Sequence, residues 1–195
     1  MPKLQKSKDK KAALLKATLS LVNTEGIQGA SMAKVAKIAK VSPATIYLYF
    51  ENKQDLVDEL YLKVKENFSI HAFEDFNEAA SIKDSFYKIW HNTVAYKLNH
   101  PEEASFLAQC DNTPMLSDNA RQNGLKQLDT LLTLWEKGQS ENILKNVSPY
   151  LMYAFTFYAM AFIMNKDNQK KCMLDKKNLE AAFEMAWDSI KINTK

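Results

Sequence analysis

The chain has 195 residues, 46% of them hydrophobic, which suffices for one large or two small domains and excludes a mainly disordered protein. The net charge of +3 is unevenly distributed, because residues 1–55 hold ten lysines against four acidic residues, a net charge of +6. A basic N-terminal third and a mildly acidic remainder indicate an anionic polymer as a partner at one end only.

Only four glycines and five prolines occur, and strand-like alternation is absent, so the sequence predicts an all-α protein. The two cysteines, Cys110 and Cys172, lack a metal-type spacing and are expected to be reduced thiols. No apolar run follows the basic N-terminus, so we expect no signal peptide. The apolar run 150–164 is shorter than the ~20 residues of a spanning helix. We therefore expect a buried helix there, in a cytoplasmic protein without a membrane partner.

The first predicted helix covers residues 7–25 and ends at Gly26, since glycine suits the left-handed residue that closes a helix. The apolar residues on its inner face are Leu14, Ala17, Leu21 and Val22. The second helix follows the N-cap Ser31. Its inner face consists of Met32, Val35, Ala36 and Ala39. The basic segment at the N-terminus is either a solubilising tail or a flexible arm that follows DNA phosphates or the minor groove.

The third predicted helix is short, residues 43–50, and follows a break at Lys40–Ser42. Ser42 is a suitable N-cap, and Pro43 occupies the first helical position, where its missing N–H costs nothing. The polar side chains that this helix exposes are Thr45, Tyr47 and Tyr49. A helix-turn-helix protein uses this arrangement to place a recognition helix in the DNA major groove.

Asn52 and Asp55 predict the N-terminus of a fourth helix, which continues to about residue 71. Longer amphipathic helices are expected after it, over residues 81–99, 101–110, 118–137 (ending at Gly138), from Pro149 onward, and 175–192. We therefore predict a DNA-binding domain at 1–55 and a second helical domain at 56–195. The two would be joined through the shared fourth helix rather than through a linker.

Residues 10–60 resemble the tetracycline-repressor (TetR) family of bacterial regulators. The matching positions are Leu14, Ala17, Leu21, Val22 and Gly26, then Val35–Ala36 and Ala39–Ser42, then Thr45–Phe50 with Lys53 and Leu56. Two positions depart from the family pattern. Ala30 and Ser31 replace two threonines, although Ser31 can still cap the helix and bind a phosphate. Lys40 replaces the glycine of the turn, where a positive φ is costly for a lysine.

The resemblance implies a homodimer of about nine or ten helices per subunit, with DNA-binding domains on a C-terminal ligand-binding and dimerisation domain. The function it implies is that of a ligand-responsive transcriptional regulator. Such a repressor would be released from palindromic double-stranded operator DNA by a small, largely apolar effector. No catalytic motif, metal motif or cofactor-binding loop occurs in the sequence, so we expect neither an enzyme, nor a metal site, nor a cofactor.

The expected DNA contacts divide into two kinds. Phosphate contacts are assigned to Ser31, Tyr47, Tyr49 and Lys53. Base reading is assigned to the start of the third helix, at Pro43, Ala44 and Thr45 with Leu48. Ser42 is also expected to lie at the DNA interface. The single arginine, Arg121, lies outside this domain, so Lys37 is the candidate for contacting guanine.

The C-terminal half is rich in aromatic residues, which fit either an ordinary core or a pocket for an apolar ligand. The candidate pocket residues are Trp90, Tyr96, Phe106, Gln109, Trp135 and Tyr153. The apolar stripes of the last two helices predict a four-helix dimer interface with Leu151, Phe155, Phe162, Leu179, Phe183 and Ile190. An alternative function remains open: a helical module that binds a small molecule or a protein and has lost DNA binding.

Overall fold

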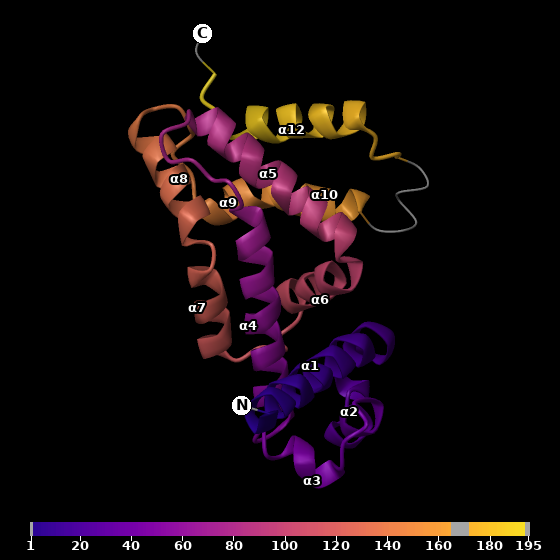
Figure 1. The fold of residues 1–195 in the computed structure, drawn as a ribbon. Coiled ribbons are helices and arrows are strands. Elements are labelled where there is room, and N and C mark those ends of the chain that lie inside the picture. Colours follow the sequence, from indigo (N-terminus) through magenta and orange to yellow (C-terminus); the bar gives the residue numbers. More distant parts are fainter. Residues whose placement is uncertain (1, 165–171, 194–195) are drawn as a thin grey trace. The chain divides into compact units, whose positions relative to one another are not determined.

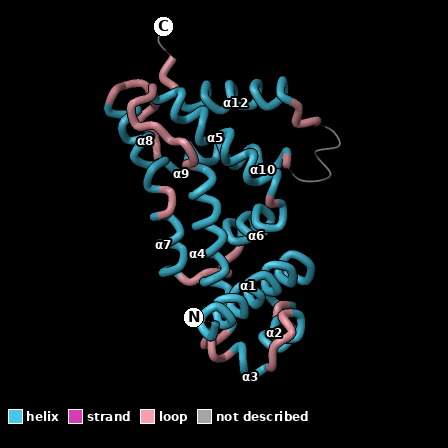
Figure 2. The backbone as a smooth tube through the Cα atoms, in the orientation of Figure 1, coloured by secondary structure: helices cyan, strands magenta, loops and turns pink. Residues whose placement is uncertain are grey.

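The computed structural model describes residues 2–164 and 172–193, and over these residues the fold is all-α, as predicted. Loops connect the helices, and no strand occurs in the described ranges (Figures 1 and 2). One isolated antiparallel bridge joins Leu144 and Lys191. No helix in the described part of the chain is long and apolar enough to cross a lipid bilayer.

The chain forms two compact units. Unit 1 comprises Met1–Asn67 and His100–Lys126, and unit 2 comprises Phe68–Asn99 and Gln127–Lys195. Helix α4 contributes residues to both units, as expected for a shared helix. The packing thus divides the chain differently from the functional division at residue 55, which remains a prediction.

Unit 1 begins with a longer helix than predicted. Its helices are α1 (Pro2–Gly29), α2 (Met32–Ile38), α3 (Pro43–Ile46), most of α4 (Lys53–Ala72), α6 (Pro101–Asn112) and α7 (Asp118–Lys126). Gly26, with φ 71°, interrupts α1 at the expected position. The basic N-terminal segment is helical from Pro2 onward, so the expectation of a flexible arm is wrong. Within this segment Lys11 forms an ion pair with Glu59 of α4.

The N-terminal helices of unit 1 enclose a small apolar core. Helices this short are not stable in isolation, and each is stabilised by the few side chains that it buries in this core. The buried residues are Leu14, Ala17, Leu21 and Val22 of α1, Val35 and Ala36 of α2, Ile46 of α3, Phe50, and Leu56 and Val57 of α4. The predicted inner face of α1 is confirmed, whereas on α2 only Val35 and Ala36 are fully buried and the predicted Met32 and Ala39 are half-buried.

Helices α4, α6 and α7 pack closely in unit 1. A Cβ on Gly124 would lie 2.3 Å from the Tyr61 ring, so glycine is required for α7 to approach this closely. Burial lowers the pKa of Lys65, and the nearby Asp111 carboxylate opposes that shift. Burial also raises the pKa of the Cys110 thiol to about 12. Cys110 is therefore a protonated, unreactive thiol, as expected.

The other helices of the described residues lie in unit 2. They are α5 (Ile82–Asn99), α8 (Asp129–Ser140), α9 (Pro149–Tyr153), the π-helix η1 (Ala154–Tyr158), α10 (Ala159–Ile163) and α12 (Lys176–Ile190). The prediction of one helix over residues 118–137 is wrong, because the chain breaks between α7 and α8. Gly138 lies inside α8, where a Cβ would come within 2.6 Å of Leu144. It permits close packing rather than ending the helix.

The core of unit 2 is strongly aromatic. Phe86, Trp90 and Phe183 are fully buried, and the Phe86 and Phe183 ring centroids lie 5.9 Å apart. The Phe157 ring meets Phe86 edge-on at 5.7 Å. Helices α5, α12 and η1 are joined through these rings, since edge-to-face and offset aromatic contacts are favourable at such distances.

The uncharged segment 149–163 buries only one of its faces, so the expectation of a buried helix is only half right. Met152, Phe157 and Met160 point into the core. The exposed large side chains on the other face are Tyr150, Leu151, Phe155, Tyr158 and Phe162. The π-helical turn η1 in the middle of this segment was not predicted.

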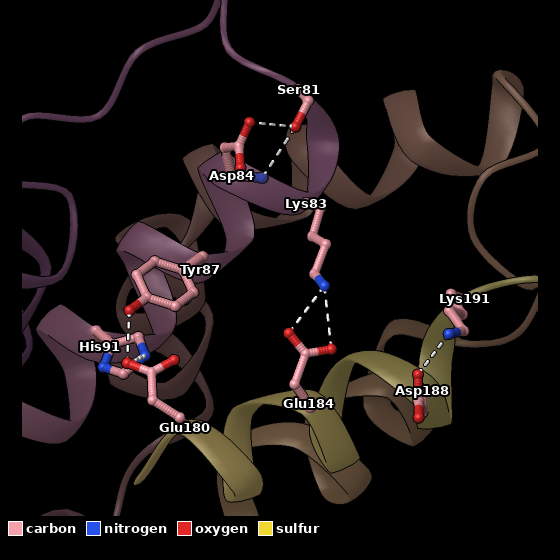
Figure 3. Close-up of polar contacts among 9 residues, drawn as sticks. All are labelled: Ser81, Lys83, Asp84, Tyr87, His91, Glu180, Glu184, Asp188 and Lys191. Carbon is pink, nitrogen blue, oxygen red and sulfur yellow. Dashed lines mark hydrogen bonds and ion pairs between the residues drawn. The ribbon is translucent and has the colours of Figure 1, made fainter. Parts of the chain in front are cut away.

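Polar contacts join α5 to α12 on the surface of unit 2 (Figure 3). Lys83 donates to both carboxylate oxygens of Glu184, at 2.8 and 3.0 Å. Tyr87 Oη donates to Glu180 Oε1 at 2.8 Å, and His91 Nε2 lies 3.9 Å from the same oxygen. The His91 imidazole stacks on Tyr87 with ring centroids 4.1 Å apart.

These contacts predict a pH-dependent stability. Burial lowers the pKa of His91, and the Glu180 carboxylate opposes the shift. The folded state therefore binds fewer protons at this site than the unfolded chain does. The resulting stabilisation is complete above the unfolded pKa of ~6.5 and is lost as the pH falls through the folded pKa. In urea unfolding, the free energy of unfolding of the wild type should fall relative to that of His91→Gln as the pH drops below the unfolded pKa. Glu180→Gln should steepen the loss, and parallel curves for wild type and His91→Gln would contradict this account.

Candidate nucleic-acid interface

The helix-turn-helix begins at Ser31, whose side chain caps α2. Ser31 Oγ accepts a hydrogen bond from the backbone N–H of Lys34 at 3.3 Å, as predicted for an N-cap. Lys34 also pairs with Glu25 of α1, which leaves less of its charge available for DNA. Lys37, one turn further along, is exposed.

The turn after α2 places Lys40 in the left-handed region, at φ 55°. The Lys40 N–H donates to Lys37 O at 3.2 Å, and the Val41 N–H donates to Ala36 O at 3.0 Å. This pair of bonds is the Schellman motif, which usually has glycine at the left-handed position. Lys40 therefore adopts the left-handed conformation of this motif at the cost of local backbone strain.

Ser42 fixes the start of α3, as predicted. Its Oγ accepts from the Thr45 N–H at 3.2 Å and lies 2.7 Å from Thr45 Oγ1. The α-helix itself covers only Pro43–Ile46 and is shorter than the predicted 43–50. The chain continues as a tight turn, because Leu48 N donates to Thr45 O and Tyr49 N donates to Ile46 O. This turn carries Phe50 into the core.

The outer surface of α3 and this turn is open to solvent. Leu48 is 82% exposed and Tyr47 is 58% exposed, and Ser42, Pro43 and Ala44 are also exposed. Thr45 is half-buried. Ile46 is fully buried behind them. Within eight residues, the side chains that pack into the core are thus separated from those that are open to solvent.

Two of the predicted contact residues are held by partners that are distant in the sequence. Tyr49 Oη lies 3.2 Å from Ser7 Oγ of α1. Lys53 Nζ donates to the backbone oxygen of Gln28 at 3.3 Å. Ser7 and Gln28 were not predicted as positioning residues, since nothing in the local sequence marks a contact across 42 or 25 positions.

Two family models match the chain. Residues 14–60 match "Bacterial regulatory proteins, tetR family", and residues 81–191 match "Tetracyclin repressor-like, C-terminal domain". The second match alone covers more than half of the chain. The chain belongs to the TetR family.

Similar proteins agree with this assignment. A helix-turn-helix regulator of Haemophilus influenzae, described as uncharacterised, is 25% identical over 177 residues, covering 91% of this chain and 93% of its own length. The crystal structure of a TetR-family regulator from Marinobacter aquaeolei superimposes with a TM-score of 0.89 at 24% identity, covering 97% and 99% of the two chains. The Bacillus subtilis regulator FadR, in complex with stearoyl-CoA, has a TM-score of 0.69 at 20% identity, covering 92% and 98%.

The protein is therefore a helix-turn-helix transcriptional regulator of the TetR family, a family of DNA-binding proteins rather than enzymes. The family match to residues 14–60 covers the Ser31, Ser42 and Lys40 geometry described above. No cluster of metal-ligating side chains occurs among the residues that the structure describes.

The six candidate pocket residues of this TetR-family chain do not gather around one cavity. Phe106 and Gln109 belong to unit 1, where Gln109 donates to Asn23 Oδ1 at 3.1 Å. The other four belong to unit 2: Trp90, Tyr96, Trp135 and Tyr153. Trp90 and Tyr96 are packed in the core, and only Tyr153 lines the small cavity found there.

The candidate dimer residues divide into two groups, and two of them need correction. Leu151, Phe155 and Phe162 are exposed, as an interface requires. Phe183 and Ile190 are buried in the core of their own subunit, because α12 turns these side chains toward α5 and η1. They cannot meet a partner while the subunit is folded. The sixth residue, Leu179, is partly buried against the same core.

The turn geometry predicts the effect of replacing Lys40. A glycine at φ 55° relieves the strain of the lysine, so Lys40→Gly should raise the free energy of unfolding by up to ~1 kcal/mol. The matched control is Lys37→Gly, which removes the same charge inside α2 and should cost ~1 kcal/mol. Urea titration followed by circular dichroism measures both. A destabilised Lys40→Gly would show that the lysine side chain stabilises the turn by more than its backbone strain costs.

Proposed function

We propose that the protein is a dimeric, ligand-responsive repressor that acts in the cytoplasm. It would bind a palindromic operator through two copies of the helix-turn-helix and leave the DNA when a small, largely apolar effector binds. The observation that carries this proposal is the exposed contact surface of α3 and the following turn, supported by a buried face that fixes its shape.

The exposed surface supports a division of labour between contacts. Tyr47 has an exposed ring, and its hydroxyl can donate to a DNA phosphate. Further contacts to the DNA backbone would come from Tyr49, Lys53 and Ser31. Base reading would fall to Ser42, Pro43, Ala44, Thr45 and Leu48, with Lys37 as a donor to guanine. Small apolar groups such as Ala44 and the Thr45 methyl suit the thymine methyl group in the major groove.

Dimerisation is supported by the exposed apolar face of residues 149–163. Large contiguous apolar patches are uncommon on monomers and usually mark an interaction surface. This face has no charged residue, and its exposed members repeat at helical spacing through Leu151, Phe155, Tyr158 and Phe162. A second copy of the same face would cover it symmetrically. The corrected interface therefore rests on this face rather than on Phe183 or Ile190.

An apolar effector is supported by the composition of unit 2, whose core is aromatic and aliphatic. FadR of Bacillus subtilis, which has a similar fold, binds stearoyl-CoA. To shift DNA-competent occupancy from 99:1 to 1:99, an effector needs ~5.5 kcal/mol of differential binding. Linkage requires operator DNA to weaken effector binding by the same factor.

Selection from a random duplex library tests the proposed function. The wild-type protein should enrich a palindrome whose half-sites are one helical turn apart, about 10 base pairs centre to centre. Affinity for that duplex should fall linearly with the logarithm of salt concentration. Absence of any enriched sequence would favour the rival function, a helical module without DNA binding.

Substitutions on the contact surface should separate positioning from base reading. Tyr47→Phe removes only a hydroxyl and should weaken binding to all duplexes, whereas Thr45→Ala should also relax the operator preference. Lys37→Ala should reduce the magnitude of the salt slope by ~1 if this lysine displaces one counterion. Fluorescence anisotropy with a salt series measures these effects. Lys176→Ala, an exposed lysine of α12, is the control and should leave the slope unchanged.

A charge on the exposed apolar face should separate the subunits. The wild type should sediment near 45 kDa, twice the 22.3 kDa chain. Phe155 is 61% exposed in the subunit, so Phe155→Glu should give a folded monomer because it places an unpaired charge in the interface. Phe183 is fully buried, so Phe183→Glu should instead abolish the cooperative unfolding transition. Sedimentation velocity and circular dichroism distinguish the two results, and a dimeric Phe155→Glu would count against this interface.

A further inference from the structure

Unit 2 contains a small cavity between the end of α4, α5, α8 and η1. Its volume is about 10 Å³, which is room for about one water molecule. The nine side chains that line it are uncharged: Phe68, Ala72, Phe73, Ile89, Thr93, Leu128, Leu131, Tyr153 and Phe157. Phe73 and Tyr153 are the two lining residues that are partly exposed, so they lie where the cavity can open to solvent.

One of the polar side chains that line the cavity, Thr93, has an unpaired hydroxyl group. Thr93 is 2% exposed, and its hydroxyl has no hydrogen-bond partner among the described residues. A buried helical threonine ordinarily donates to the carbonyl four residues earlier. Thr156 and Thr18 do so, at 2.7 and 2.8 Å. Thr93 therefore keeps a donor available at the cavity wall, although leaving a buried polar group unpaired is costly.

A second unpaired donor lies close behind the wall. Trp135 is one turn beyond Leu131 on α8, and its ring centroid lies 6.3 Å from that of Phe157. Its Nε1 is buried and has no partner within the described residues. The Trp90 indole, by contrast, donates to Thr156 O at 3.1 Å. The two unpaired groups can both donate, and the indole can only donate.

The wall facing α5 is not an ordinary helix. Tyr153 ends α9 and Phe157 lies within η1, so the π-helical turn carries this side of the cavity. Short π-helical turns within α-helices are frequent at functional sites. The cavity has room for about one water, so an organic ligand can enter only if this wall moves, and the π-helical turn is where the helix is already irregular.

Building on the proposed ligand response, we infer that this cavity binds a neutral, mainly apolar ligand through one hydrogen-bond acceptor such as a ketone or ester oxygen. Thr93 donates to that oxygen, and Trp135 supplies a second donor to a ligand that reaches past Phe157. A carboxylate is excluded, because no cation lines the cavity to offset the desolvation of its charge. A pure hydrocarbon would leave the donors unpaired.

Isothermal titration calorimetry with 2-nonanone and nonanoate tests the ligand class. Wild type should bind the ketone at least tenfold more tightly than the carboxylate of equal chain length. Thr93→Val, which keeps the shape and removes the hydroxyl, should weaken ketone binding about fivefold to tenfold. Thr93→Ser keeps the hydroxyl and should retain most of the affinity, and Trp135→Phe tests the second donor.

Thermal unfolding of the ligand-free variants provides an independent readout. Thr93→Val should have a midpoint equal to or above that of wild type, since no hydrogen bond is lost. The control Thr18→Val, in unit 1, should unfold at a lower temperature and bind the ketone normally. A Thr93→Val variant as destabilised as Thr18→Val would show that the hydroxyl is already paired and would overturn the inference.

The binding inference is also overturned if wild type binds no ketone, if Thr93→Val binds it as well as wild type does, or if nonanoate binds better. Operator binding measured on the same preparations separates this failure from failure of the proposed function. Intact DNA binding without ketone binding refutes the ligand class alone. Ketone binding that depends on Thr93, without any DNA binding, refutes the repressor and leaves the ligand site standing.

Discussion

Burial of Ile46 and Phe50 is the constraint on which the exposed surface of α3 and the following turn depends. Helix α3 has four residues, far fewer than an isolated helix needs to persist in water. Its conformation is therefore imposed by the surrounding helices, because α3 packs against α2 and both of these side chains are completely buried. Leu48 and Tyr47 can be exposed only because their neighbours are completely enclosed. The basic and aromatic contact groups depend on the same packing, since Tyr49 and Lys53 are tied to α1 through Ser7 and Gln28.

In unit 2 a longer segment is divided in the same way between a buried face and an exposed face. The segment 149–163 has apolar side chains on both faces, and only one face can be satisfied within a single chain. Met152, Phe157 and Met160 complete the aromatic core, while Phe155 and Phe162 are left on the outside. The π-helical turn η1 contributes to both surfaces, because Phe155 lies on the exposed face and Phe157 lines the cavity. A change in the register of η1 would move side chains both at the cavity wall and on the exposed face.

The sequence predicted the local features well, because their causes are local. The caps at Ser31 and Ser42 form as predicted, since each depends on a side chain reaching an N–H three residues away. The cost of Lys40 in the turn was also readable, because the family pattern places a left-handed residue there. The inward face of α1 followed from helical spacing alone.

Other features depend on contacts between distant segments and could not be predicted. The apolar stripe of α12 could be predicted from the sequence. Which of its residues face the core depends on how α5 and η1 lie against it. Phe183 and Ile190 face inward. Gly138 looked like a helix stop because close packing against Leu144 leaves no trace in the local sequence. The aromatic residues 90–153 suggested one pocket, whereas Gln109 and Phe106 pack in the other unit.

The distribution of tryptophan gives the molecule an uneven optical signature. All three tryptophans, Trp90, Trp135 and Trp187, belong to unit 2, whereas the helix-turn-helix contains tyrosines but no tryptophan. Indole emission excited at the red edge of the absorption band therefore comes from one half of the protein. The other half can unfold, or seat itself on DNA, without a direct change in that emission. A spectroscopist who sees the indole signal move when operator is added would be observing communication between the two units rather than contact with the DNA.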